Sequence, residues 1–334
     1  MSRRSRRKAV IQLIVYFTVR AVVFVVRTVS PRIAFIMADA VGDAMSRLIR
    51  RRSTTALENV RHAFPELGSD PAAADALVGA MYRHLIRAAV EVILAGRKLR
   101  PSTWQRYMAF NEDEKALLLQ AFDSKRPVLI VTAHLGNWEL AGLAFGLLGY
   151  RTHAIARALD NPYLDRYVRK LRSATGQDII AKHGDFDRLA AVLAAGGNIA
   201  TLADQDAGPH GVFVDFFGRL ASTHKAVALL ALKHDIVLFV GAVPRVPRHR
   251  HPPGHGRPAD GLESMCYAYE LGEVIDPRGY AGLPRAAAVR AITARYTTAL
   301  ERLIRRYPEQ YFWLHRRWKT RPPTPDHRWV ARGA

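Results

Sequence analysis

The stretch HLGNWE, residues 134–139, contains the best candidates for acid–base chemistry in the chain. His134 is a potential general base, and the carboxylate of Glu139 can hold an imidazole in one tautomer and stabilise the imidazolium that forms when it takes a proton. Two helical residues five positions apart would point about 140° away from each other, so the pair can meet only if His134 precedes the helix. A surface histidine beside a glutamate favoured by the helix dipole is the alternative interpretation of this spacing.

The residues around HLGNWE predict the geometry that the pair needs. The preceding run PVLIVTA is typical of a buried strand, and the apolar run from Asn137 is typical of a helix with an asparagine N-cap. Gly136 permits a tight turn between the two elements. We therefore expect His134 in a strand-to-helix turn and Glu139 in the first helical turn, where open α/β sheets bind their ligands. The chain has no G-x-S-x-G, Walker-type, H-E-x-x-H or G-x-G-x-x-G motif that would indicate another chemistry.

Residues 101–321 are predicted to form one α/β domain. From Pro127, short β-rich runs alternate with helical segments, which is typical of a mainly parallel central sheet flanked by helices. Residues 31–100 show helical spacing and are expected to pack on this core, and residues 322–334 are expected to form a C-terminal tail. The histidine-rich segment 244–261 is predicted to be an exposed loop. Its histidines lack a carboxylate or a second cluster to complete a site, so we expect no metal.

Residues 1–30 are predicted to form a basic membrane anchor. The run RRSRRK precedes a mostly apolar stretch from Ala9 to Ser30, and about 20 residues suffice for a helix to cross a bilayer. The helical wheel places four polar residues within one arc: Gln12, Tyr16, Arg20 and Arg27. This stripe favours a helix that is tilted, lies in the interface or packs on its own domain. A cleaved signal peptide and a buried N-terminal helix are the alternatives.

The charge of the chain predicts an anionic partner. Fifty Lys and Arg residues against 29 Asp and Glu give a formal charge of +21, which fits an anionic membrane, a phosphorylated substrate or a nucleic acid. In YFWLHRRWKTRP, residues 311–322, aromatic and basic side chains alternate as at a membrane interface that bears phosphates. Stacking on a nucleic acid and a solvated basic face are the alternatives. Cys266, as the single cysteine, excludes an intramolecular disulfide.

The sequence resembles the bacterial lipid A late acyltransferases of the lauroyl/myristoyl type, within the lysophospholipid acyltransferase superfamily. Three stretches carry the resemblance: AHLGNWE at 133–139, ADQDAGPHGVFVDFFGRLAST at 203–223, and YFWLHRRWKTRP at 311–322. The first matches the His-x4-acid motif of the superfamily in its glutamate form. The chain departs from the family pattern at Asp215, where a neutral residue, often proline, is expected, and this bears on the shape or acyl preference of that segment.

The resemblance implies transfer of a fatty acyl chain from acyl carrier protein to a hydroxyl of a hydroxyacyl chain on a lipid A precursor. The reaction would take place at the cytoplasmic face of the inner membrane, without a covalent acyl-enzyme and without a cofactor. His134 would be the general base, Glu139 would orient it, and Arg157 would stabilise the charge on the thioester carbonyl. The residues implied in substrate binding or site ordering are Asn137, Asp204, Gln205, Asp206, Arg316 and Lys319.

Two other functions remain compatible with the sequence. An acyltransferase of the same superfamily could use another acceptor, such as a glycerophospholipid or a mannosylated inositol lipid. A non-enzymatic basic protein that binds membranes or nucleic acid would explain the charge but not HLGNWE at a strand end, and we see no nucleic-acid fold signature. From the residues alone, Arg157 also fits a solvent-facing position, and Asp204–Asp206 an acidic turn before Gly208. No nucleic-acid partner is expected.

Overall fold

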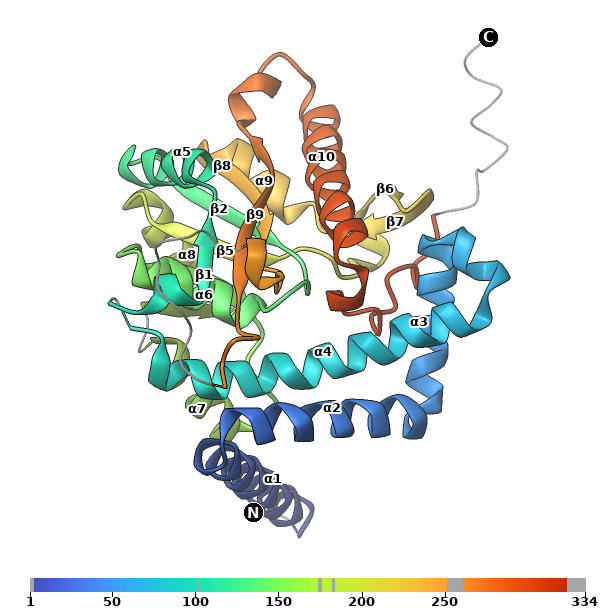
Figure 1. Cartoon of the computed structure of the whole chain (residues 1–334). Helices are drawn as coiled ribbons and strands as arrows, with labels where there is room; N and C mark the ends of the chain where they lie inside the picture. Colours follow the sequence, from blue (N-terminus) through green and yellow to red (C-terminus); the bar gives the residue numbers. More distant parts are fainter. Residues whose placement is uncertain (1–2, 101, 174–175, 182–183, 251–260, 323–334) are drawn as a thin grey trace.

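A seven-stranded sheet forms the centre of the computed structural model, which describes residues 3–100, 102–173, 176–181, 184–250 and 261–322 (Figure 1). The strands run in the order β1-β9-β8-β2-β5-β3-β4. Their bounds are β1 Met108–Phe110, β2 Val128–Thr132, β3 Thr152–Ala156, β4 Gln177–Ala181, β5 Asn198–Leu202, β8 Val237–Ala242 and β9 Tyr267–Ile275. Among these neighbours, only β8 and β9 pair antiparallel. The expected α/β fold with a mainly parallel sheet is confirmed.

Helices cover both faces of the sheet. They are α5 Glu112–Asp123, α6 Trp138–Leu147, α7 Pro162–Ser173, α8 Phe186–Ala194, α9 Ala226–His234 and α10 Arg285–Arg306. A hairpin of β6 Val212–Phe216 and β7 Arg219–Thr223 lies beside α10. Short 3-10 helices span Pro65–Ser69, Trp104–Arg106, Gly208–His210, Arg248–Arg250, Pro277–Tyr280 and Pro308–Gln310.

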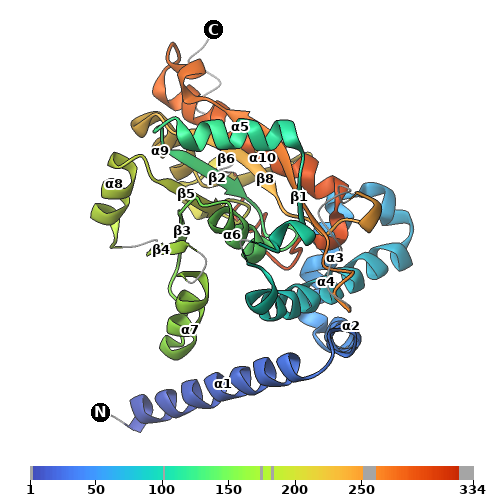
Figure 2. The ribbon, with the colours of Figure 1, turned by 60° about the vertical axis from the view of Figure 1, so that its left-hand side comes forward.

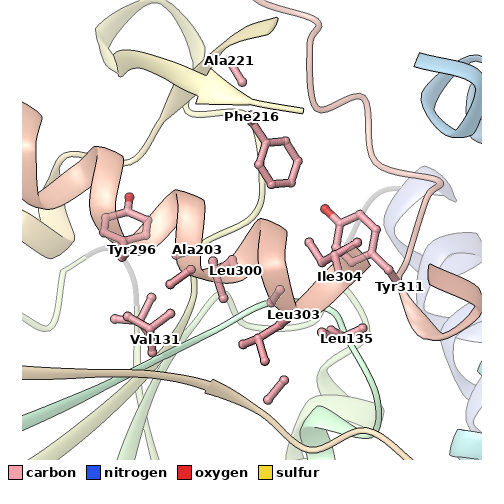
Figure 3. Packing of buried hydrophobic residues seen from close by; sticks show 14 of the residues in the cluster. Val131, Leu135, Ala203, Phe216, Ala221, Tyr296, Leu300, Leu303, Ile304 and Tyr311 are labelled. Atoms are coloured by element: carbon pink, nitrogen blue, oxygen red, sulfur yellow. The ribbon is translucent and has the colours of Figure 1, made fainter. Parts of the chain in front are cut away.

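The central strand β2 contributes to two hydrophobic cores because its successive side chains point to opposite faces of the sheet. Leu129 and Val131 belong to the core that contains α9 and α10, and Figure 3 shows Val131 and Leu135 near side chains of α10. Val128 and Ile130 belong to the core that contains α5 and α6. A strand that is buried on both faces reads as a continuous apolar run, as PVLIVTA does.

The N-terminal quarter of the chain is helical. Its helices are α1 Arg3–Thr28, α2 Pro31–Leu48, α3 Arg50–Ala63 and α4 Pro71–Lys98. Figures 1 and 2 show α4 next to the sheet domain, with α2 packed along α4 and α1 on the same outer side of the molecule as α2. The long helix α4 thus separates the sheet domain from α2.

Helix α1 is long and apolar enough over Arg7–Thr28 to cross a membrane. Its predicted polar stripe contacts the protein. The Gln12 amide donates to the carbonyl of Asp160 at 2.8 Å, and the Arg20 guanidinium lies 5.2 Å from the centre of the Tyr167 ring on α7. Most of the apolar remainder of α1 stays exposed, whereas Val23 and Val26 are buried.

Two sequence predictions fall partly outside the described residues. Within the expected loop 244–261, residues 251–260 are outside them, and the expected tail 322–334 is outside them from residue 323 onward.

Candidate active site

HLGNWE forms the predicted strand-to-helix turn between β2 and α6. Gly136 has a φ of +64°, and a Cβ at this position would lie 2.2 Å from the carbonyl oxygen of Val243. Only glycine fits such a left-handed, crowded position without strain. The turn is tied to its surroundings by two backbone hydrogen bonds, from Gly136 N–H to Gln310 at 3.1 Å and from Asn137 N–H to Val243 at 2.9 Å.

His134 is paired with Asp204. The strands β2 and β5 are parallel neighbours with Thr132 opposite Leu202, and each is followed two residues later by one member of the pair. Nδ1 of His134 lies 2.9 Å from Oδ1 of Asp204, and the backbone N–H of His134 donates to Oδ2 at 3.0 Å. Both oxygens of one buried carboxylate therefore hold this single residue.

Electrostatics keep Asp204 ionised. Burial raises the pKa of its carboxyl, but the nearby His134, which also donates hydrogen bonds, and His315 lower the pKa by more, so that it lies well below its ordinary value. An ionised carboxylate can only accept hydrogen bonds, so we assign the proton of neutral His134 to Nδ1. Nε2 of His134 then carries the free lone pair of a general base.

Glu139 does not form the expected hydrogen bond with His134. Its carboxylate accepts hydrogen bonds from Nε of Arg172 on α7 at 2.9 Å and from Nη2 of the same residue. The expectation that Glu139 orients the imidazole is therefore corrected, because Asp204 already occupies Nδ1 from the neighbouring strand. Glu139 lies in the first turn of α6, as expected, but its side chain extends toward α7.

Aromatic rings surround His134. The ring centres of His315 and Trp138 lie 4.5 Å and 5.1 Å from that of His134, and the backbone N–H of Phe312 donates to the His134 carbonyl at 2.9 Å. Burial lowers the pKa of His315 to about 4; the Asp204 carboxylate opposes this effect, and Arg317, together with His134 when it is protonated, adds to it. His315 is therefore neutral near pH 7. Its Nε2 lies 3.4 Å from Nε2 of Gln205.

Within the described part of the chain, His134, Asp204 and His315 are the one group of side chains whose positions suit a metal ion. Potential ligand atoms of His134, Asp204 and His315 all lie within 4.8 Å of one another. The hydrogen bond between His134 and Asp204 uses a potential ligand atom of each residue, which favours acid–base chemistry at this site.

An apolar slot opens beside the histidine, between α6 and the sheet. We define the apolar slot by its main lining residues, Ile130, Phe145, Ala154, Ala200, Val243 and Tyr269. Its cavity volume is about 80 Å³, and the wider space around it, which includes open solvent, is about 670 Å³. Trp138 also lines it, next to the His134 ring, and the Glu139–Arg172 pair is part of its polar lining. A long apolar group in the slot would thus lie close to Trp138, whose ring contacts that of His134.

The comparisons with known proteins agree with this geometry. The model of the bacterial lipid A biosynthesis acyltransferase family matches residues 1–320. The chain belongs to this family. The predicted family is thus confirmed, and the chain is an acyltransferase of the lipid A biosynthesis family.

Three curated relatives show how far the similarity to individual acyltransferases extends. The lipid A biosynthesis lauroyltransferase of Escherichia coli (strain K12) is 30% identical over 59% of this chain, and the match covers 58% of that relative, less than two thirds of its length. The lipid A biosynthesis palmitoleoyltransferase of the same organism is 25% identical over 84% of this chain and 83% of the relative. A phosphatidylinositol mannoside acyltransferase of Mycolicibacterium smegmatis is 29% identical over 36% of this chain and 41% of the relative.

Asn137 of this acyltransferase forms its side-chain hydrogen bonds within the protein. Its side chain is buried, its Oδ1 accepts from Leu140 N–H at 3.2 Å as the predicted N-cap, and its Nδ2 donates to Glu91 and to the carbonyl of Ala88. The expectation that Asn137 binds substrate is corrected, because the partners of its amide are inside the protein.

The other predicted residues of the acyltransferase lie around the site without touching His134. Asp206 accepts from the Thr320 hydroxyl at 2.8 Å and so ties the loop after β5 to the C-terminal segment. Arg316 and Lys319 are exposed in that segment. Arg157, directly after β3, is also exposed and pairs with Asp160 at 3.0 Å. Their roles toward substrate remain predictions.

The sequence did not predict a buried polar network behind the turn that holds His134. Glu91 on α4 is fully buried and accepts from Arg245 at 2.8 Å and from Asn137 at 3.1 Å. His84, seven residues earlier on α4, lies 3.1 Å from the carbonyl of Gly136 and 3.2 Å from Arg245. Two polar residues seven apart within an apolar helical segment were the available signal, because such residues share one face of the helix.

Proposed function

We propose that this acyltransferase moves a fatty acyl chain from an acyl carrier protein thioester to a hydroxyl of a hydroxyacyl chain on a lipid A precursor, at the cytoplasmic face of the inner membrane. The observation that carries the proposal is the His134–Asp204 pair beside an apolar slot. The pair supplies a base, and the slot suits a fatty acyl chain. The overall positive charge of the chain fits an acceptor that bears phosphates.

In the proposed mechanism, Asp204 holds Nδ1–H of His134 so that Nε2 faces the acceptor hydroxyl. Nε2 takes the hydroxyl proton as the oxygen attacks the thioester carbonyl, and Asp204 stabilises the imidazolium that results. Collapse of the tetrahedral intermediate breaks the carbon–sulfur bond. The imidazolium then returns the proton to the departing thiolate of the carrier protein, so that the histidine is again neutral.

Three cationic residues are proposed to hold the charged parts of the substrates. Arg157 follows β3, whose last residue Ala156 lines the slot, and its guanidinium is proposed to stabilise the developing oxyanion after it leaves Asp160. The exposed Arg316 and Lys319 are proposed to bind phosphates of the acceptor. Gln205 and Asp206 are proposed to order the loop and the C-terminal segment around the acceptor.

Incubation of the full chain with acyl-acyl carrier protein and a lipid A precursor tests the function. Mass spectrometry should show a gain of one acyl chain on the precursor. Parallel reactions with a glycerophospholipid and with a phosphatidylinositol mannoside test the alternative acceptors. Acylation of either of these lipids without acylation of the precursor would overturn the proposed acceptor but not the chemistry.

A further inference from the structure

Exposed large apolar side chains concentrate at the N-terminus of the protein. Eight lie on α1 and five lie on α2, against five in the rest of the described chain. Those of α2 are Ile33, Ile36, Met37, Val41 and Leu48, which we call the α2 stripe. Ile36 and Met37 follow Ile33 by three and four residues, Val41 follows Met37 by four and Leu48 follows Val41 by seven, which puts all five on one face of the helix. Soluble monomers rarely expose a contiguous apolar surface of this kind without a partner.

Helix α2 buries mainly small residues and exposes large apolar ones, which is the reverse of a helix at the surface of a soluble domain. Its buried face consists mainly of small residues, and a Cβ at Gly42 would lie 2.6 Å from the Cα of Arg83 on α4. Ala34 and Ala38 are buried on the same face. Close approach through small residues, with large apolar side chains turned outward, is typical of helices that pack against each other in lipid.

The charges of α2 are placed for a lipid surface. Its two acidic residues, Asp39 and Asp43, are paired with Arg87 and Arg83 of α4. The exposed Arg32 and Arg47 stand near the two ends of the helix. Basic residues that flank an exposed apolar stripe favour an interface with anionic lipid headgroups.

The α2 stripe lies on the helix that directly follows the exposed apolar helix α1. Two residues separate the helices, and Ser30 caps the start of α2 by accepting from Ile33 N–H. Both helices lie on the same outer side of the molecule and run in clearly different directions (Figures 1 and 2). With a single helix in the membrane, the attached domain can still rotate about the axis of that helix. Two membrane-bound helices that run in different directions prevent this rotation and fix the orientation of the domain relative to the bilayer.

We infer that α2 is a second membrane element of this protein, with the α2 stripe buried among the acyl chains at the surface of the leaflet. The α1 anchor and α2 together set the orientation of the sheet domain relative to the bilayer. This inference concerns membrane contact alone, so it stands or falls independently of the acyl transfer reaction.

Site-directed fluorescence in the full-length protein tests the inference. The buried Cys266 is replaced by alanine, and single cysteines are introduced by Ile36→Cys on α2, Phe24→Cys on α1 and Leu283→Cys before α10. Leu283 is a matched control because it is an exposed leucine, and the start of α10 lies on the side of the molecule away from α2 (Figure 1). Each cysteine carries an environment-sensitive dye. The protein is reconstituted into vesicles of phosphatidylethanolamine and phosphatidylglycerol, with or without bromine on the acyl chains.

Brominated lipid should quench the dye at position 36 by about as much as the dye at position 24, and should leave the dye at position 283 unchanged. A dye at position 36 that remains in water while the dye at position 24 is quenched would overturn the inference. A dye at position 36 that is shielded from water but insensitive to bromine would assign the face to a protein partner, which overturns it as well. Met37→Cys provides a second position if Ile36→Cys does not fold.

Discussion

Nδ1 of His134 lies 2.9 Å from a carboxylate oxygen of Asp204, across the ends of two neighbouring parallel strands. Because the carboxylate holds one nitrogen of the imidazole, the other is free to accept a proton. Glu139, the acidic residue of the HLGNWE motif, binds Arg172 on α7 instead. The two carboxylates of the site therefore occupy different places: Asp204 orients the imidazole of His134, and Glu139 lines the slot. These two roles can be tested separately.

Replacement of His134 by alanine should lower the rate of acyl transfer by at least about 10²- to 10⁴-fold, the usual contribution of a general base. The fold should remain intact, because among the described residues the His134 side chain hydrogen-bonds only to Asp204, and the buried carboxylate keeps the backbone N–H of residue 134 as a donor. The measurement is the initial rate of acyl transfer, with circular dichroism as the control for folding. A variant with near-normal rates would rule out His134 as the base.

Asp204→Asn and Glu139→Gln should have different effects. The asparagine keeps the shape of Asp204 but removes the charge that stabilises the imidazolium, so kcat should fall by about 10²- to 10⁴-fold. Glu139→Gln weakens the pair with Arg172 at the slot and should act mainly on KM for the acyl donor. Both constants are measured for both variants. A larger loss of kcat for Glu139→Gln than for Asp204→Asn would reverse the assignment.

Ala200→Leu should shift the acyl preference toward shorter chains. Ala200 lies on β5 two residues before its end, about 7 Å deeper along the strand than Leu202, and it lines the apolar slot. A leucine there fills space that a long chain would use. A competition among acyl carrier protein thioesters of several lengths, followed by lipid mass spectrometry, measures the shift. Ala190→Leu, on the exposed side of α8, is the matched control and should leave the preference unchanged.

The stability of the protein should fall as the pH is lowered from about 6.5 to 4. Burial holds the pKa of His315 at about 4 in the folded state, below the ordinary 6.5, so within this range the unfolded chain takes up a proton that the folded chain does not. Burial and Arg245 lower the pKa of His84 to about 3, which acts in the same direction. His315→Asn should therefore flatten the pH dependence of the free energy of unfolding in part. An unchanged slope in this variant would contradict the lowered pKa.

Removal of one partner of the buried Glu91–Arg245 pair should cost about 3–5 kcal/mol of stability, because it leaves an uncompensated charge inside the protein. Chemical denaturation of Arg245→Met measures this loss. The double variant Glu91→Leu with Arg245→Met should recover much of the stability and so shows that the cost comes from the orphaned charge. The turn at Gly136 should remain disturbed in the double variant, because Asn137 loses its hydrogen bond with Glu91.

The local features of the site could be predicted from the sequence. The apolar run before His134, the N-cap at Asn137 and the glycine between them fixed the strand-to-helix turn, since each acts through its nearest neighbours. The resemblance placed Asp204 among the residues of substrate binding or site ordering but did not identify its partner. What remained out of reach was the strand order, which places β5 directly beside β2 and thus selects Asp204 over Glu139 as the partner of His134.

Burial was the second property that the sequence did not predict. From the sequence alone, Asn137 is a plausible ligand for the substrate and Glu91 a plausible surface residue. In the structure α4 packs on the turn, so that both side chains are buried and hydrogen-bond to each other. Both depend on contacts between segments more than 40 residues apart, which follow from the packing of α4 and not from any short pattern.

The position of β2 in the middle of the sheet has a consequence for how this protein can change over time. The strand is paired on both edges and buried on both faces, so it opens only when much of the domain unfolds. His134, two residues after this strand, is therefore held by a part of the domain that resists local opening. Substitutions among the side chains that line the apolar slot, in α6 or in strands such as β5, can therefore alter the bound chain without loosening β2.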